Sequence, residues 1–217
     1  MMKKIKKEYY FIAVLFICFV ALTLFVIFGK TNMLDEMIFN GLIRFENDLI
    51  TKILYVITNL ASTIGIIVLL IITAIFFIKK KSFSEFKYVM VNVGVGVILI
   101  QVLKTIIRRT RPSWKWIIQS GFSYPSGHTI SSLLFYGTLI LLVYKKVDGK
   151  LKKPLIIIFS LMIILTAISR VYFGAHYLTD VIASILLGFI ILIISSLLMD
   201  REFSNDKNKN RKTIQTK

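Results

Sequence analysis

The chain has 217 residues, 56% of them apolar or aromatic, and carries 28 Lys and Arg against 11 Asp and Glu. An ordinary soluble domain has an apolar share of ~45–50%, so a soluble fold would have to expose much of this chain to water. A membrane-spanning helix needs about 20 apolar residues, and the apolar content is sufficient for roughly six such helices. Together with a mean hydropathy of +0.77, these values indicate an integral membrane protein.

The formal net charge is +17, which in a soluble protein would suggest a nucleic-acid partner. Membrane proteins, however, keep an excess of Lys and Arg in their cytoplasmic loops. No basic face with interleaved aromatic residues lies outside the apolar runs, so we expect no nucleic-acid binding. The single cysteine, Cys18, excludes an intramolecular disulfide and a site built from several cysteines.

Six apolar runs predict an all-α protein with six transmembrane helices. In chain order they are Tyr10–Phe28, Leu60–Ile78, Tyr88–Ile107, Ser126–Tyr144, Leu155–Val171 and Tyr177–Met199. The first run follows four lysines but is long and is not followed by a small-residue cleavage site. It is therefore predicted to be an uncleaved span rather than a signal peptide.

Two further segments are not apolar enough to cross a membrane. Thr31–Asn59 has apolar residues at helical spacing with charged residues among them, which predicts an amphipathic extracytoplasmic helix leading into the second span. Residues 203–217 are polar and basic without periodicity, and they predict a disordered cytoplasmic tail. Residues 1–202 are expected to form one membrane domain.

The distribution of Lys and Arg predicts the orientation of the chain in the membrane. With the N-terminus inside, cytoplasmic segments carry 19 of the 28 cations and outer segments carry 9. Because positive residues favour the cytoplasmic side, both termini of this multi-pass protein are predicted inside the cell membrane. The ends of spans three to six that carry unusual polar residues then lie on the outer face.

The first of these polar strings runs from Lys104 to Pro112. Lys104, Arg108 and Arg111 are spaced to share one stripe of a helix that Pro112 ends. Such cations suit phosphate oxygens, which Arg binds with a planar fork and Lys with a point charge. The alternative is that they only extend to lipid headgroups. Arg109, on another side of the helix, is expected to contact headgroups.

The second string is Pro125-Ser126-Gly127-His128, at the start of the fourth span. Ser126 is a suitable N-cap residue, and Gly127 allows the backbone to approach an anion closely. The free N–H groups of a helix start, aided by the helix dipole, form an anion site. Simple capping would explain the serine and the glycine but not His128.

The third string, Ser169 to Asp180, contains His176 and Asp180 one helical turn apart. A carboxylate beside an imidazole fixes its tautomer and stabilises the charged ring, and the other ring nitrogen can then attack phosphorus. His128 and His176 are the two histidines of the chain, and both lie in these strings. Two imidazoles and a carboxylate could instead bind zinc or iron. The surrounding cations would repel a metal and attract an anion, so an anion site without metal is predicted.

The three strings resemble the signature motifs of the type 2 phosphatidic acid phosphatase family. That family shares its site with vanadium-dependent haloperoxidases and bacterial acid phosphatases. The pattern is Lys, six residues, Arg-Pro; then Pro-Ser-Gly-His; then Ser-Arg, five residues, His, three residues, Asp. All 11 specified positions are matched between Lys104 and Asp180.

The resemblance implies a role for each matched residue. His176 would be the nucleophile that forms a phosphohistidine, with Asp180 orienting it. His128 would protonate the leaving alkoxide and later activate water. The phosphate oxygens would be bound by Lys104, Arg111, Ser126, Gly127 and Arg170. The family needs no metal or other cofactor.

A membrane site implies a phosphorylated lipid substrate, because soluble members of this superfamily lack six membrane helices. Phosphatidylglycerophosphate, phosphatidic acid and undecaprenyl diphosphate are all candidates, since the motifs recognise only phosphate. The loop residues Trp114, Trp116, Phe122 and Tyr124 suit an interfacial belt or a lid. The alternative function is non-enzymatic binding or transport of a lipid phosphate at the same site.

Overall fold

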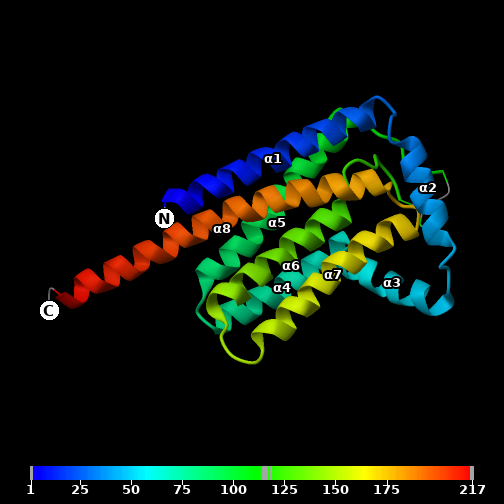
Figure 1. Cartoon of the computed structure of the whole chain (residues 1–217). Helices are drawn as coiled ribbons and strands as arrows, with labels where there is room; N and C mark the ends of the chain where they lie inside the picture. Colours follow the sequence, from blue (N-terminus) through cyan, green and yellow to red (C-terminus); the bar gives the residue numbers. More distant parts are fainter. Residues whose placement is uncertain (1, 114–116, 118, 216–217) are drawn as a thin grey trace.

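The computed structural model describes residues 2–113, 117 and 119–215, and it describes side chains for residues 7–113, 117 and 119–202. Trp114 and Trp116 lie outside the described residues. The described residues form eight helices and no strand, which confirms the all-α class (Figure 1). The helices are α1 (Met2–Ile27), α2 (Asn32–Ile43), α3 (Asp48–Leu60), α4 (Thr63–Lys79), α5 (Phe83–Ile107), α6 (Gly127–Lys146), α7 (Lys152–Tyr172) and α8 (Leu178–Gln215).

Among the described residues, five helices are long and apolar enough to cross a membrane: α1, α5, α6, α7 and the first part of α8. A sixth crossing needs α3 and α4 together, which pass the same test as a pair bent by 62°. The second span was predicted as one run from Leu60, but the chain bends at this point and α4 has only 17 residues. The hydroxyl of Ser62 accepts from the N–H of Gly65 at 3.1 Å and so caps the new helix.

The segment between the first two spans also differs from the prediction of one amphipathic helix. It forms two helices, α2 and α3, because polar residues interrupt the pattern and the side chain of Asn47 accepts from the N–H of Leu49 at 2.8 Å to start α3. The tail predicted to be disordered continues α8 as helical backbone to Gln215. It contains no Gly or Pro to end the helix.

Helix α6 is the centre of the bundle and packs against α5, α7 and α8, while α1 packs along α8 (Figure 1). Small residues allow this close approach. A Cβ atom at Gly96 of α5 would lie 2.2 Å from Leu134 of α6, and one at Gly188 of α8 would lie 2.4 Å from Leu133 of α6. Side chains of α6 therefore fill the space that glycines on its neighbours leave open.

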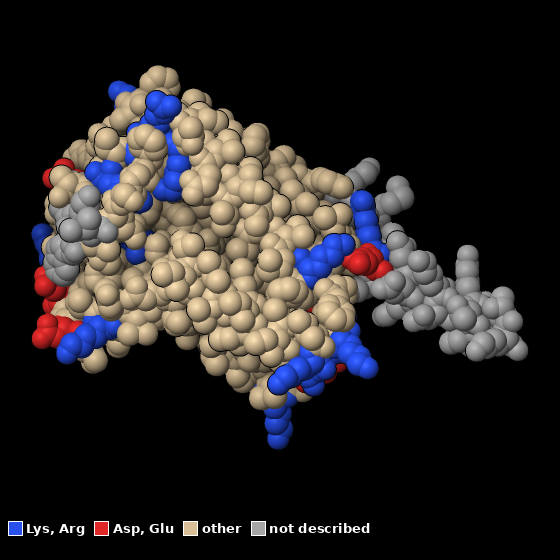
Figure 2. All heavy atoms as spheres, turned by 180° about the vertical axis from the view of Figure 1, so that it is seen from behind, with Lys and Arg blue, Asp and Glu red and all other residues tan. Residues whose placement is uncertain are grey.

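Charged side chains gather at the two ends of the molecule, with a broad uncharged surface between them (Figure 2). One end carries the connections α4–α5 and α6–α7. The other carries α2, α3, the end of α5, the start of α6 and the connection α7–α8 (Figure 1). All three polar strings reach this second end, as the alternation of spans predicted.

Candidate active site

The first string leaves its helix earlier than the predicted stripe requires. Helix α5 ends at Ile107, and Arg108 adopts a left-handed conformation (φ 51°) in which its N–H donates to the carbonyl of Lys104 at 3.0 Å. The exposed Arg108 side chain donates back to the carbonyl of Thr105. Residues 109–111 are not helical, so the predicted stripe that included Arg108 is wrong, and Arg109 points inward instead.

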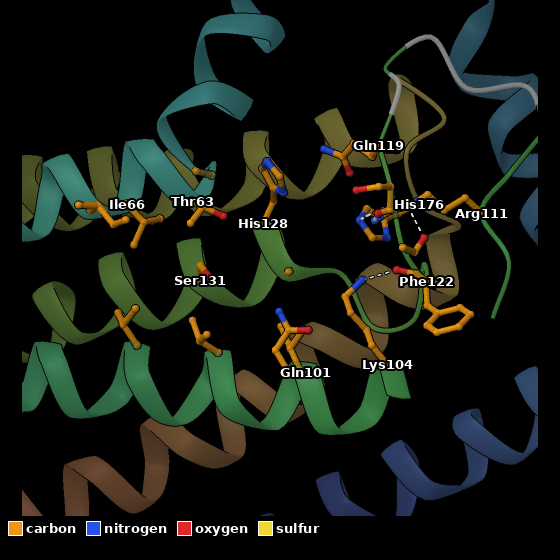
Figure 3. A pocket seen from close by; sticks show the side chains of 18 of the residues that line it. Thr63, Ile66, Gln101, Lys104, Arg111, Gln119, Phe122, His128, Ser131 and His176 are labelled. Atoms are coloured by element: carbon orange, nitrogen blue, oxygen red, sulfur yellow. Dashed lines mark hydrogen bonds between the residues drawn. The ribbon is translucent and has the colours of Figure 1, made fainter. Parts of the chain in front are cut away.

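Two cations of this string donate to backbone carbonyls of the loop that precedes α6, and Arg111 also donates to the connection between α7 and α8. The guanidinium of Arg111 donates, at 2.8–3.2 Å, to the carbonyls of Ser120, Gly121 and Ala175. The ammonium group of Lys104 donates to the carbonyl of Phe122. Their charges therefore face one cavity from α5 and from the loop (Figure 3).

The second string connects the start of α6 to the start of α8. Ser126 is the N-cap residue, as predicted, but its side chain makes no capping bond. Its N–H donates to the carbonyl of Asp180 at 3.3 Å, and its carbonyl accepts from the hydroxyl of Ser184 at 2.9 Å. A Cβ atom at Gly127 would meet nothing within 4 Å, because the backbone there borders the cavity. Ser126 is thus bonded to Asp180, and Gly127 borders the cavity.

The third string reverses direction at a glycine. Gly174 has φ +59°, which glycine adopts without steric cost. This turn allows the N–H groups of Ala175 and His176 to donate to the carbonyl of Arg170, each at 3.1 Å. His176 is thereby held over the end of α7, where it faces Arg111.

The two ring nitrogens of His176 have different partners. Nδ1 lies 3.3 Å from Oδ2 of Asp180, and Nε2 lies 3.2 Å from Nη1 of Arg111. A guanidinium only donates hydrogen bonds, so Nε2 is the accepting nitrogen and Nδ1 carries the proton. The lone pair on Nε2 of the buried ring therefore points toward Arg111, whose side chain lies beside His176 in Figure 3.

The surroundings of His176 favour the neutral ring. Burial is the largest effect that lowers its pKa well below the ordinary 6.5, and the charges of Arg170, Arg111 and Lys104 lower the pKa further. Because a nucleophilic imidazole must be unprotonated, this environment keeps His176 in the reactive form.

Arg170 is 1% exposed and lies at the end of α7. Its Nη1 donates to the hydroxyl of Thr58 at 2.5 Å, whereas Nε and Nη2 have no hydrogen-bond partner among the described residues. Buried donors without partners are rare and costly. An anion bound beside His176 would satisfy them.

His128 is half-buried in the first turn of α6 and projects into the same cavity (Figure 3). The cavity has a volume of about 850 Å³, and its polar end is lined by Lys104, Arg111, Gly127, His128 and His176. Ser126, Arg170 and Asp180 are buried just behind this lining. The eight predicted site residues therefore meet at one end of the bundle.

No group of three or more His, Cys, Asp or Glu side chains within the described part of the chain is arranged to hold a metal ion. The site is instead dominated by three cations and two imidazoles. Its charge suits an anion with several oxygens, and an unprotonated imidazole nitrogen such as Nε2 of His176 is chemically able to attack the central atom of such an anion.

The contacts of two residues behind the site, the partly buried Arg109 and the buried Asp35, were not predicted. Arg109 was expected to contact lipid headgroups, but it forms ion pairs with Asp180 at 2.6 Å and with Asp35 at 2.8 Å. Asp35 was treated as one polar residue of an amphipathic helix, yet it is 1% exposed. Its spacing within α2 contains no signal that it faces α8 rather than solvent.

Comparison with known proteins identifies relatives of this chain. The sequence model of the PAP2 superfamily matches residues 86–204. Phosphatidylglycerophosphatase B of Bacillus subtilis (strain 168) is 29% identical over 184 residues, which are 83% of this chain and 90% of that protein. Sphingosine-1-phosphate phosphatase 1 of Rattus norvegicus is 37% identical over 111 residues, which are 46% of this chain and 24% of that protein.

Two solved structures share the fold. The crystal structure of a transmembrane PAP2 type phosphatidylglycerolphosphate phosphatase from Bacillus subtilis aligns with a TM-score of 0.77 and 26% identity, over 88% of this chain and 97% of that one. The structure of Aquifex aeolicus LpxE aligns with a TM-score of 0.62 and 24% identity, over 75% of this chain and 94% of that one. The second likeness concerns the fold alone.

Proposed function

Since the chain belongs to the PAP2 superfamily, we propose that this membrane lipid phosphatase hydrolyses a lipid phosphate through a phosphohistidine formed on His176. The observation that carries the proposal is the orientation of the buried His176 ring. Its Nε2 lone pair faces Arg111, while Asp180 holds the opposite nitrogen. An anionic phosphate bound by the cations would place its phosphorus in front of this lone pair.

The reaction then has two steps. In the first, Nε2 of His176 attacks phosphorus while the bond from phosphorus to the lipid oxygen breaks, and His128 gives its proton to that oxygen. In the second, His128 takes a proton from water, the water oxygen attacks phosphorus, and the phosphorus–nitrogen bond breaks. Asp180 stabilises the positive ring during both steps.

The phosphate oxygens need donors that are already in place, because phosphoryl transfer depends on positioning and charge stabilisation. Lys104 and Arg111 face the cavity, and two buried donor atoms of Arg170 have no partner within the described part of the chain. Ser126 adds a hydroxyl proton, since its oxygen already accepts from Thr129 at 2.9 Å. The open space at Gly127 allows the backbone of α6 to approach the anion. No step requires a metal or other cofactor.

The shape of the cavity supports a lipid substrate. From the cationic end it extends between α4 and α5, where its walls are apolar: Ile66, Ile67 and Leu70 of α4, and Val93, Val97 and Ile100 of α5. A cationic end joined to an apolar arm fits a phosphorylated headgroup with a hydrocarbon chain. Phosphatidylglycerophosphate is the first candidate by similarity to the Bacillus relative, followed by phosphatidic acid and undecaprenyl diphosphate.

The positive-inside bias supports a site on the outer face of the cell membrane, with both termini in the cytoplasm. The non-enzymatic alternative is not retained. Phosphatidylglycerophosphatase B resembles this chain over 90% of its own length, and all the motif positions that the chemistry needs are present.

Release of inorganic phosphate from a panel of lipid phosphates tests the proposal, with His176→Ala as the key variant and Arg108→Gln as the control. We expect His176→Ala to be inactive and Arg108→Gln to retain activity. Vanadate should inhibit, since it adopts the five-coordinate geometry of the phosphoryl group in transfer, and EDTA should not. Retained turnover in His176→Ala, or loss in EDTA that zinc restores, would contradict the mechanism.

A further inference from the structure

A chain of buried ionic contacts lies behind the nucleophile. From Asp35 on α2 it passes through Arg109, after the end of α5, to Asp180 on α8 and then to His176. The side chains of Asp35 and Asp180 are 0% exposed and that of Arg109 is 10% exposed. We infer that Asp35 and Arg109 are positioning residues, which orient Asp180 and through it the reactive ring. This inference rests on the proposed mechanism.

The contacts of Asp180 show how Arg109 could orient it. Nη1 of Arg109 donates to Oδ1 at 2.6 Å. The other oxygen, Oδ2, faces Nδ1 of His176 at 3.3 Å and accepts from the N–H of Tyr177 at 3.1 Å. Each oxygen thus has its own partners, and a rotation of the carboxylate would break both sets. Arg109 binds Oδ1 of Asp180, and His176 contacts Oδ2. By holding Oδ1 in place, Arg109 fixes the direction in which Oδ2 points.

Asp35 holds the opposite side of the same guanidinium. Its Oδ2 accepts from Nη2 of Arg109 at 2.8 Å, and its two oxygens also accept from Thr179, from the N–H at 3.0 Å and from the hydroxyl at 2.8 Å. Thr179 lies in the first turn of α8, directly before Asp180. A carboxylate at this helix start also interacts favourably with the helix dipole. Asp35 therefore positions both the guanidinium and the turn that bears Asp180.

The charges of this chain match the needs of the reaction. Asp35, Arg109 and Asp180 have a formal net charge of −1, because two buried carboxylates share one guanidinium. When Nε2 of His176 bonds to phosphorus, its ring becomes positive and faces this negative group. An arginine paired with Asp180 alone would neutralise the carboxylate. The second carboxylate, Asp35, restores the negative charge on the Nδ1 side of the ring, opposite the nitrogen that would bond to phosphorus.

The test compares Asp35→Asn with Glu36→Gln, which removes an exposed carboxylate from the next position of α2. Asp35→Asn should lower kcat about 10–100-fold, because small misplacements of a reactive group have effects of this size, while KM changes less than about twofold. The inhibition constant of vanadate, which must bond to the ring, should rise in parallel, and that of inorganic phosphate should not. Glu36→Gln should match the wild type in all four quantities.

A second measurement combines Asp35→Asn with Asp180→Asn. Because Asp35 acts through Asp180, the double variant should be no slower than Asp180→Asn alone. Arg109→Lys, which keeps the charge but not the fork, should lose kcat and vanadate affinity in the same ratio. It provides the same test if Asp35→Asn does not fold.

Three outcomes would overturn the inference: equal weakening of vanadate and phosphate, multiplicative losses in the double variant, or an unchanged kcat per folded molecule. The proposed function has a separate indicator, the activity of His176→Ala. An inactive His176→Ala beside a fully active Asp35→Asn would contradict only the positioning role. An active His176→Ala would contradict the phosphohistidine mechanism itself.

Discussion

The buried ring of His176 is neutral and is held in one tautomer. Asp180 binds the protonated Nδ1, and the cations on the other side disfavour a second proton. The same cations that would bind phosphate thus also keep the ring of His176 unprotonated. In the proposed mechanism, the ring would therefore stay able to attack phosphorus below the pH at which a free imidazole becomes charged.

We predict that the ring of His176 remains neutral through pH 6.5. Its pKa is lowered, so protonation, and with it loss of the nucleophile, occurs only as the pH falls through that lower value. The chain has two histidines, so His128→Asn, purified without a histidine tag, leaves a single imidazole for 15N NMR. The spectrum should show a protonated Nδ1, an unprotonated Nε2 and no titration near pH 6.5. A midpoint at or above 6.5, or the opposite tautomer, would contradict the assignment.

His128 is predicted to act on the leaving group. It projects into the cavity from the start of α6, whereas His176 borders the same cavity from just before the start of α8. His128→Ala should slow the release of lipid alkoxides by about 10²–10⁴-fold, the usual contribution of general acid catalysis. An activated aryl phosphate, whose leaving group needs no proton, should lose far less in the first step. Measuring phosphoenzyme formation from both substrates tests this, and equal losses would make His128 a binding residue.

At the scale of elements, the site is assembled from helix ends. The last turns of α5 and α7 bring Lys104 and Arg170, and the first turns of α6 and α8 bring His128 and Asp180. Helix ends have backbone groups without partners inside the helix, so polar ligands are stabilised there at low cost. Inside the spans the same groups are already paired, which explains why the chemistry lies at the end of the bundle.

The bend between α3 and α4 depends on Gly65. A Cβ atom at this position would lie 2.3 Å from the carbonyl oxygen of Asn59 and 2.5 Å from that of Leu60. Both are backbone atoms, so Gly65→Ala would require the bend itself to move. We expect it to lower the free energy of unfolding by about 1–3 kcal/mol, as overpacking does.

Thermal unfolding in detergent measures this change, and lipid KM reports on the neighbouring Ile66 in the cavity wall. Gly94→Ala is the matched control, because a Cβ atom there would meet nothing within 4 Å. The control should be as stable as the wild type or gain up to about 1 kcal/mol, because alanine has a higher helix propensity than glycine. Equal stability of the two variants would show that the bend does not need glycine.

At the scale of the whole molecule, two charged ends enclose an uncharged middle, as expected for a protein that crosses a bilayer (Figure 2). The end that bears the site is also the end that bears α2 and α3 (Figure 1). The side of the membrane that this end faces determines which pool of lipid the enzyme meets. The bias of 19 cations against 9 predicts the outer side.

A pair of single cysteines introduced into a Cys18→Ala background tests this orientation. Glu46→Cys lies between α2 and α3, and Asp148→Cys lies between α6 and α7, where both native side chains are exposed. A membrane-impermeant thiol reagent applied to intact cells should label the first and not the second. Both should be labelled in opened membranes. The reverse pattern would place the site inside, with newly made phospholipid precursors as its substrates.

The amino-acid sequence by itself determined the class of the protein and the identity of its motif residues. Long apolar runs predict membrane helices because a run of apolar residues can be read directly from consecutive positions of the chain. Five such runs match the membrane-crossing parts of single helices to within about five residues at each end. The spacing of His176 and Asp180 predicts their contact because one helical turn is a local geometry. The catalytic roles of these residues stay predictions until the variants above are measured.

The tertiary structure alone decided which arginine turns inward and which residues lie behind His176. Arg108 ends α5 in a left-handed conformation, so the next residue, Arg109, reaches Asp35, 74 positions away, and Asp180, 71 positions away. The bend before α4 likewise depends on contacts that no hydropathy pattern contains. Periodicity describes which face of an isolated helix is apolar. The partner of a polar side chain is set by helices that meet only when the bundle is assembled.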